Sequence, residues 1–157
     1  MSATNARKTK EVHVYTDGGC HGNPGPGGWA YVLEVDGFRH AEKGAEKRTT
    51  NNRMELSAVI HALRHLSRQG LCESATVHIH TDSQYVRNGI TSWIHTWEGN
   101  GWKTSARKPV KNRELWMSLR EAERRCRVEW HWVRGHSGHA GNEEVDGLVQ
   151  DAIAEIS

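Results

Sequence analysis

The sequence predicts a single α/β domain built on a mixed β-sheet with helices on its faces. Two observations support this prediction: apolar and polar residues alternate in the first part of the chain, and from residue 52 apolar residues recur at helical spacing. The expected order is three hairpin-linked strands, then helix, strand, helices, strand and helix. The strand after the first helix can pair in parallel with the first strand, because the helix provides the crossover connection.

Three strands are expected before residue 50. They are residues 11–16, 29–35 and 38–47. The first alternates Val12 and Val14 with polar neighbours, and Asp36-Gly37 predicts a tight hairpin turn between the second and third. Residues 18–28 are rich in glycine and proline, so we interpret them as a turn.

Helical spacing governs most of the second part of the chain. The first helix, residues 52–68, has its apolar stripe at Leu56, Val59, Ile60, Leu63 and Leu66. A strand at 75–81, helices at 84–97 and 111–125, and a strand at 127–133 follow, with a polar connection at 98–109. The closing helix carries one apolar face, made by Val145, Leu148, Val149, Ala152, Ile153 and Ile156.

Composition limits the classes of function. The 157 residues fit one domain, expected at residues 11–157 after a short basic tail at 1–10. Lys and Arg number 21 against 19 Asp and Glu, a formal charge of +2, which excludes a polycationic coat for nucleic acid. No apolar run approaches the roughly 20 residues that span a bilayer, and the N-terminus lacks a secretory signal, so we expect no membrane association.

The three cysteines, Cys20, Cys72 and Cys126, are odd in number and far apart, without a CxxC pair. They predict neither a disulfide framework nor a zinc knuckle. A reducing cytoplasm is therefore the expected compartment.

Four carboxylates are expected to meet at one edge of the sheet. Asp17 and Asp82 end two strands that can lie side by side in parallel, where ligands of open α/β sheets gather. Glu55 begins the first helix and Asp146 the last, and each lies within about 20° of the apolar face of its helix. Taken singly, these acids would be turn-opening, capping or first-turn residues, but their convergence favours a common site.

Carboxylates gathered without a counter-charge repel one another and partly protonate. Cations would keep them ionised, and hard oxygen ligands suit Mg²⁺ or Mn²⁺. Two such ions about 4 Å apart can activate water on one side of a phosphodiester and stabilise the leaving oxygen on the other. The sequence thus favours metal-dependent phosphodiester hydrolysis.

Seven ordered motifs resemble those of type 1 ribonuclease H, the bacterial-type RNase HI family. They are TDGGCHGNPGPGGWAYVL, TTNNRMEL, TDSQYV, GITSWIH, GWKT, KPVKNRELW and WVRGHSGHAGNEEVD, and they span roughly residues 12–152. The resemblance implies the RNase H-like fold, with five strands in the order 3-2-1-4-5. It also implies two-metal endonucleolytic hydrolysis of the RNA strand of RNA–DNA hybrids, which leaves 5′-phosphate and 3′-hydroxyl ends.

The resemblance also assigns roles to catalytic residues. Asp17, Glu55, Asp82 and Asp146 resemble the family's metal-binding carboxylates, which take two Mg²⁺ with substrate and accept Mn²⁺ as a substitute. His136, on a glycine-containing loop at 135–141, resembles the catalytic histidine, which transfers a proton or assists product release. Glu143 either assists metal exchange or is an ordinary acid at a helix N-terminus.

Substrate contacts are implied in two regions. Cys20, Asn23, Asn51, Asn52 and Gln84 resemble the readers of the 2′-hydroxyl groups that distinguish RNA from DNA. Asn51-Asn52 and Asn23-Pro24 also fit a helix cap and a turn, and both interpretations can hold together. Thr50 and Asn112 fall where the family binds a DNA phosphate.

A tryptophan-rich segment resembles the family's handle for the DNA strand. Trp93, Trp97 and Trp102 precede or interleave with lysine and arginine, a pattern suited to sugars, bases and phosphates. Packing alone would also explain Trp93 and Trp97, four residues apart. Glu98-Gly99-Asn100 stands where the best-known bacterial pattern has a basic run, so we expect weaker hybrid affinity.

Three rival functions differ in class. A binding module that has lost catalysis is disfavoured because all four carboxylates and His136 are present. A zinc protein using Cys126, His131, His136 and His139 has a spacing that matches no common finger. A nuclease for RNA duplexes or DNA is disfavoured only by resemblance. We expect a monomer without an obligatory protein partner.

Overall fold

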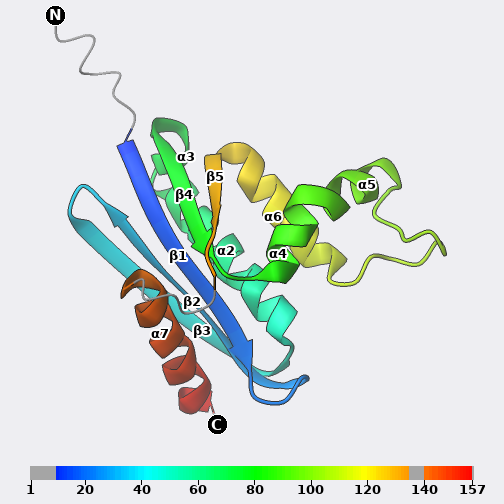
Figure 1. The fold of residues 1–157 in the computed structure, drawn as a ribbon, viewed down its shortest axis with the longest axis horizontal. Helices are drawn as coiled ribbons and strands as arrows, with labels where there is room; N and C mark the ends of the chain where they lie inside the picture. The colour runs from blue at the N-terminus through cyan, green and yellow to red at the C-terminus, as the bar shows by residue number, and fades with distance from the viewer. Residues whose placement is uncertain (1–9, 135–139, 157) are drawn as a thin grey trace, which may run out of the picture.

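The computed structural model describes residues 10–134 and 140–156, and these residues form one five-stranded mixed sheet flanked by helices (Figure 1). The strands are β1 (Lys10–Cys20), β2 (Gly25–Val35), β3 (Phe38–Thr49), β4 (Ala75–Thr81) and β5 (Arg127–Trp132). Their order is β3-β2-β1-β4-β5, as the resemblance implied. β1 pairs antiparallel with β2 and parallel with β4, which in turn pairs parallel with β5.

The helices follow the predicted order with some differences in detail. They are α2 (Asn51–Arg68), α3 (Leu71–Ser74), α4 (Gln84–Asn88), the π-helical segment η1 (Gly89–Trp93), α5 (Ile94–Gly99), α6 (Arg113–Arg125) and α7 (Ala140–Ile156). The single helix predicted at 84–97 is thus a continuous helical stretch that contains a π-helical turn. The short α3 has no counterpart in the prediction. No helix within the described ranges is long and apolar enough to cross a membrane.

The sheet separates two apolar clusters of unequal size. On one face, α2 and α6 enclose the larger core, in which Leu56, Leu63 and Trp116 are fully buried against β1 and β4. On the other face, α7 covers Ala30 and Val32 of β2. In Figure 1 α7 lies over the β2 and β3 side of the sheet, while the α2 face carries the remaining helices.

The prediction of a turn over residues 18–28 is wrong for most of that range. β1 continues to Cys20 and β2 starts at Gly25, so only residues 21–24 separate the strands. The paired backbones of Gly19 and Gly28 explain the difference. Ladder hydrogen bonds and tight packing here outweigh the low strand propensity of glycine. The turn at Asp36-Gly37 is confirmed, with φ values of 51° and 78° that fit a tight hairpin.

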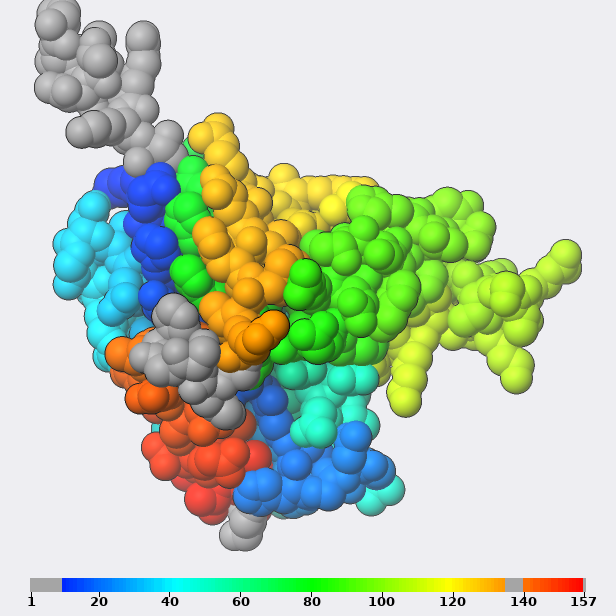
Figure 2. All heavy atoms as spheres, in the orientation of Figure 1, coloured from blue at the N-terminus to red at the C-terminus, as the bar shows by residue number. Residues whose placement is uncertain are grey.

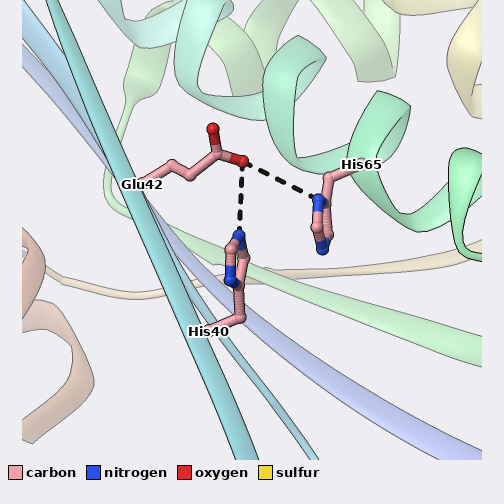
Figure 3. A group of neighbouring side chains, drawn as sticks. All are labelled: His40, Glu42 and His65. Atoms are coloured by element: carbon pink, nitrogen blue, oxygen red, sulfur yellow. Dashed lines mark hydrogen bonds and ion pairs between the residues drawn. The ribbon is translucent and has the colours of Figure 1, made fainter.

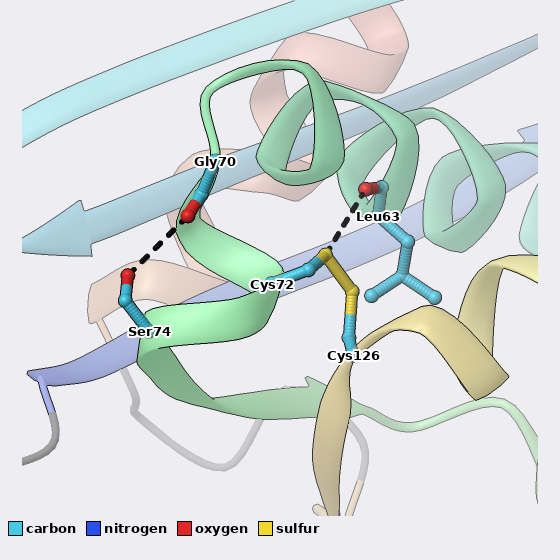
Figure 4. The surroundings of a disulfide bond; sticks show 5 residues. All are labelled: Leu63, Gly70, Cys72, Ser74 and Cys126. Carbon is cyan, nitrogen blue, oxygen red and sulfur yellow. Dashed lines mark hydrogen bonds between the residues drawn. A yellow bond between two sulfur atoms is a disulfide. The ribbon is translucent and has the colours of Figure 1, made fainter.

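The expectation of no disulfide is also wrong, since Cys72 and Cys126 form one (Figure 4). Their Cα atoms are 4.3 Å apart although 54 residues separate them in sequence. Cys72 lies on α3, the element that the sequence pattern missed, and Cys126 joins α6 to β5. The parallel pairing of β4 and β5 brings the residues before each strand together, which spacing along the chain does not reveal.

Gly18 allows β1 to approach the first turn of α2. A Cβ atom at this position would lie 2.3 Å from the carbonyl carbon of Met54 and 2.5 Å from the backbone nitrogen of Glu55. Both are backbone atoms, so a side chain could be accommodated only by moving the helix. The neighbouring Gly19 has room, since its nearest contact would be Val149 Cγ1 at 3.7 Å.

We therefore expect Gly18→Ala to lower the free energy of unfolding by about 3 kcal/mol, or roughly 6–12 °C in Tm, because the added methyl overpacks a backbone contact. Gly19→Ala serves as the matched control and should change Tm by less than a third of that amount. Thermal unfolding followed by circular dichroism measures both. Equal Tm values for the two variants would contradict the close approach of β1 and α2.

Candidate active site

Two acids stand side by side where β1 and β4 approach their carboxyl ends. Tyr15 pairs with His80 in the parallel register, and two residues further along each chain are Asp17 and Asp82. Asp17 still belongs to β1, whereas Asp82 follows the last residue of β4. Both side chains line a small cavity, together with Thr16, Asn142 and Val145.

The helix α2 supplies the third acid. Thr50 caps this helix, its Oγ1 accepting from the Arg53 backbone N–H at 3.3 Å. The cap fixes where the first turn begins, and the contact of Gly18 with Met54 and Glu55 holds that turn against β1. Glu55 is consequently mostly buried, close enough to Asp82 for their charges to repel.

The closing helix α7 supplies the fourth. Asp146 lies between the buried Val145 and the exposed Gly147, and its charge reaches Asp17. Val145 and Val149 anchor the helix on β2. The structure thus brings together all four carboxylates that the sequence singled out.

The electrostatics of this cluster are unfavourable without a cation. Burial, with repulsion from Asp82, Asp146 and Glu55, raises the pKa of Asp17 to about 7, although the Gly18 N–H acts in the opposite direction. Burial and Asp82 likewise raise the pKa of Glu55 to about 7, against a hydrogen bond from Ser83. Within the part of the chain that the structure describes, no lysine or arginine is among the groups that set these values.

This donor set fits divalent cations with a preference for oxygen. Carboxylate oxygens at the rim of a cavity, without a basic partner, are the environment that hard ions such as Mg²⁺ or Mn²⁺ neutralise. A positive charge at this position would remove both the repulsion and the cause of the raised pKa values. The chemistry open to such a site is activation of water and stabilisation of a leaving oxygen at a phosphodiester.

The remaining acid and base predictions have different outcomes. His136 lies outside the described residues. Glu143 is exposed in the first turn of α7, as either interpretation of it required. Sequence reasoning missed Asn142, which is buried beside Asp17, with no hydrogen-bond partner for its side-chain atoms among the described residues. Asn142 directly precedes Glu143, and this position was the sequence signal that could have revealed it. Amides in the first turn of a helix are common capping residues, however, so the signal is weak.

The expected 2′-hydroxyl readers meet at the start of α2. Asn23 Oδ1 accepts from the Asn51 backbone N–H at 3.2 Å, which ties the 21–24 turn to the helix. Cys20 Sγ lies 2.7–3.2 Å from the carbonyl oxygens of Gly22, Gly25 and Thr49, so the thiol helps to order the same turn. The interpretation of Asn23-Pro24 as a turn is confirmed, but Asn51-Asn52 is not the cap of α2: Thr50 is the cap, and the two asparagines are the first residues of the helix.

Asn52 and Gln84 begin neighbouring helices, α2 and α4. Gln84 is exposed and Asn52 is partly exposed. Ser83 caps α4 by accepting from the Val86 N–H at 3.0 Å. Both amide side chains therefore stand beside helix starts that adjoin the carboxylates.

The tryptophan-rich segment forms one aromatic cluster. Trp97 packs against Trp93, Trp102 and Trp116, with ring centroids 5.5–6.3 Å apart. Tyr85 joins it by accepting from the Nε1 of Trp116 at 2.9 Å. The packing interpretation is thus correct for Trp97, while Trp93 keeps 38% of its surface exposed.

Asn112, the expected phosphate contact, is fixed on both sides. Its Nδ2 donates to the Tyr85 hydroxyl at 3.2 Å, and its Oδ1 accepts from Arg53 Nη1 at 3.2 Å. Arg53 is held in turn by Glu114 at 2.7 Å. Thr50 accepts a hydrogen bond from the backbone N–H of Arg53, so Arg53 contacts both Thr50 and Asn112.

Glu98 has a structural partner that the sequence did not reveal. Its Oε2 accepts from Arg120 at 3.2 Å and from Arg124 at 2.5 Å, which ties α5 to α6. The acid that interrupts the expected basic run therefore neutralises two nearby arginines. A pair separated by more than 20 residues leaves no local sequence signal.

Comparison with known proteins places this geometry in a family. The sequence model of the RNase H family matches residues 9–154. The chain is 53% identical over 148 residues to the Ribonuclease H of Cupriavidus metallidurans, covering 94% of this chain and 99% of that one. The crystal structure of LC9-RNase H1, a type 1 RNase H with the type 2 active-site motif, has a TM-score of 0.84 at 38% identity and covers 95% of this chain and 74% of that chain.

A further solved structure shares the fold. LC11-RNase H1 in complex with RNA/DNA hybrid has a TM-score of 0.71 at 24% identity, covering 92% of this chain and 98% of that chain. The family match and the identity to the Cupriavidus protein each extend over nearly the whole domain. This chain belongs to the ribonuclease H family and is a nuclease of the hydrolase class.

Proposed function

We propose that this enzyme cuts the RNA strand of RNA–DNA hybrids internally, by two-metal-ion hydrolysis that leaves 5′-phosphate and 3′-hydroxyl ends. The observation that carries the proposal is the convergence of Asp17, Glu55, Asp82 and Asp146, with no lysine or arginine among the described residues that set the pKa values of the first two. A relative of the same fold is known in complex with RNA/DNA hybrid, which supports the choice of substrate.

The four carboxylates would hold two Mg²⁺ ions, with Mn²⁺ as a substitute, and the ions supply an activated water and stabilise the leaving oxygen. Asp17 and Asp82, on adjacent strands, fix the centre of the site. Glu55 and Asp146 reach it from helices on opposite faces of the sheet. His136 has the role of transferring a proton or assisting product release.

Recognition of the hybrid would come from two surfaces. One surface combines residues at the start of α2 with the first residue of α4, and these would contact 2′-hydroxyl groups of the RNA strand: Cys20, Asn23, Asn51, Asn52 and Gln84. Trp93, Trp97, Trp102, Thr50 and Asn112 would contact the DNA strand. Asn112 is held by Tyr85 and Arg53, so its position is set before substrate arrives.

We propose Mg²⁺ as the working ion, a monomer as the working state and the cytoplasm as the compartment. Disulfides are rare in a reducing cytoplasm, so the bond between Cys72 and Cys126 argues against the cytoplasm and is the observation that a test of the compartment must address. Cys20, the only free cysteine among the described residues, is the last residue of β1, and its thiol contacts the carbonyl oxygen of Thr49 just before α2.

The direct test is cleavage of one labelled RNA strand, paired with DNA, paired with RNA or alone, each with Mg²⁺, Mn²⁺ or EDTA. We expect cutting in the hybrid only and with metal only. Asp82→Asn should lower the rate at least about 10³-fold, because it removes a metal-binding carboxylate. Asp151→Asn, an exposed acid on α7, is the matched control and should cut normally. A folded wild-type protein that binds hybrid without cutting it would contradict the proposal and favour a binding module.

Carboxylate repulsion predicts that the metal-free enzyme gains stability when Asp17 is replaced. The folded-state pKa of about 7 lies above the ordinary value of 3.8, so the charged form is disfavoured in the fold and stability falls as the pH rises through 7. At pH 8, Asp17→Asn should therefore have a free energy of unfolding about 1–3 kcal/mol higher than that of wild type, and so unfold at a higher temperature. At pH 4 the two proteins should unfold at nearly the same temperature. Thermal unfolding in EDTA measures the difference in Tm between the variant and wild type, and added Mg²⁺ should make this difference smaller. Identical curves at pH 8 would show that the cluster is not repulsive.

The handle predicts a salt effect. Asn100 is exposed next to α5, and arginine there would add a phosphate contact. Asn100→Arg should tighten hybrid binding and steepen the dependence of log K on log salt by about 0.9. Gln69→Arg, exposed at the far end of α2, adds the same charge as a control and should leave the slope unchanged. Glu98→Lys should bind the hybrid less tightly than Asn100→Arg, because it breaks the contacts of Glu98 with Arg120 and Arg124. Equal slopes for Asn100→Arg and wild type would exclude a DNA-strand contact at this position.

A further inference from the structure

Histidines line the sheet face that α7 leaves open. The parallel registers set His13, His78 and Glu129 in one row across β1, β4 and β5, and Tyr15, His80 and His131 in the next. These positions alternate with buried core residues, so they share one face of the sheet. Figure 2 shows β1, β4 and β5 side by side on this face, beyond the edge of α7.

Three potential ligand atoms converge in this array. His78 Nδ1 lies 2.8 Å from His131 Nε2 and 3.9 Å from Glu129 Oε1, and all three ligand atoms lie within 4.8 Å of one another. The rings of His78 and His131 are tilted by 40°, so their planes intersect and their lone pairs can point to a common centre. Glu129 keeps 59% of its side chain exposed, so the site is reachable from solvent.

A second carboxylate fixes the tautomer of the central histidine. His78 Nε2 lies 2.6 Å from Glu11 Oε1. Since an ionised carboxylate only accepts hydrogen bonds, Nε2 carries the proton and Nδ1 of the neutral ring has a free lone pair. This lone pair faces His131. A carboxylate behind a histidine in this way is the arrangement that orients metal-ligating imidazoles.

We propose that His78, His131 and Glu129 form a binding site for a borderline transition-metal ion such as Zn²⁺, separate from the Mg²⁺-type carboxylate site. Two imidazoles and one carboxylate suit Zn²⁺, at about 2.0–2.2 Å from each ligand. Ligand atoms of such a tetrahedral ion are about 3.3 Å apart. The observed separations of 2.8 and 3.9 Å lie on either side of that value, so small side-chain rotations suffice.

Binding the ion requires one proton to move. In the metal-free protein, His131 Nε2–H donates to His78 Nδ1, because Glu11 holds His78 in the other tautomer. The ion takes the place of that proton, and His131 becomes protonated at Nδ1 instead. Two neutral imidazoles thus ligate without net proton release, and three protein ligands leave a fourth position for water.

The site lies away from the catalytic acids. His78 lies on β4 and Asp82 directly follows that strand, four residues later, which is about 13 Å along an extended chain. None of its ligands is one of the four carboxylates or a substrate-contact residue. This site differs from the zinc set considered from the sequence, in which Cys126 is bonded to Cys72 and His136 and His139 lie outside the described residues.

A second histidine group on the opposite face fits an ion less well (Figure 3). His40, Glu42 and His65 also converge, with Glu42 Oε2 3.3 Å from His40 and 3.7 Å from His65. The two rings are stacked 4.2 Å apart at an angle of only 8°, so an ion in the plane of one ring lies outside the plane of the other. Glu42 is also engaged by the Tyr31 hydroxyl. This group therefore provides a matched control.

The test is isothermal titration of the full, untagged chain with Zn²⁺ in excess Mg²⁺, which competes for the carboxylates, with the Co²⁺ absorption spectrum as a report on nitrogen ligands. We expect one tight site in the wild type. His78→Gln and His131→Gln should each weaken it at least about 10-fold, and Glu11→Gln, behind His78, by about 10-fold. Glu129→Gln, at an exposed position, should also weaken it, which keeps the test valid if a histidine variant fails to fold. His40→Gln and His65→Gln should bind as wild type.

Hybrid cleavage with Mg²⁺ should be unchanged in His78→Gln, so failure of this proposal is distinguishable from failure of the proposed nuclease function. Unaltered Zn²⁺ affinity in His78→Gln and Glu129→Gln would overturn the site. Loss of Zn²⁺ binding in His40→Gln or Asp82→Asn alone would overturn it as well, because the ion would then bind at the second histidine group or at the carboxylates.

Discussion

Four carboxylates that repel one another must be held together by the scaffold of this domain. Asp17, Glu55, Asp82 and Asp146 come from two strands and two helices, and burial with mutual repulsion raises the pKa of two of them to about 7. Such a cluster destabilises the metal-free fold above neutral pH. The rest of the domain must therefore hold together elements that their own charges push apart, until a cation binds.

The scaffold does this through backbone contacts and apolar anchors rather than through ion pairs at the site. The parallel register of β1 and β4 sets Asp17 beside Asp82, and the absent side chain of Gly18 lets α2 approach. Val145 and Val149 hold α7 to the sheet on the other face. Ion pairs are used elsewhere: Glu98 joins α5 to α6, so charges as well as aromatic packing hold the tryptophan-rich segment, whereas packing holds the elements of the carboxylate site.

The sequence predicted the elements with periodic apolar patterns and the four acids, because those signals are local. It failed where tertiary contacts decide the outcome. Residues 18–28 looked like a turn, yet strand pairing extends β1 and β2 into them. Cys72 and Cys126 are distant in sequence and meet only through the pairing of β4 and β5. The partners of Glu98, the burial of Asn142 and the meeting of His78 with His131 likewise depend on residues from different elements. The strand alternation of β5 places His131 on the same face of the sheet as His78, diagonally across from it.

The two proposed metal sites differ in their ligands. Four carboxylates gather near the ends of β1 and β4, whereas two imidazoles and one carboxylate lie on the face of β4 and β5 that α7 leaves open. Nuclear magnetic resonance titration of the carboxyl carbons of Asp17 and Glu55, without metal and with Mg²⁺, measures whether these carboxylates form a repulsive cluster that requires a cation. We expect apparent pKa values of about 7 for these two groups without metal, and a clear decrease in both values when Mg²⁺ is added. Titration of both groups near the ordinary values, unaffected by Mg²⁺, would contradict this expectation.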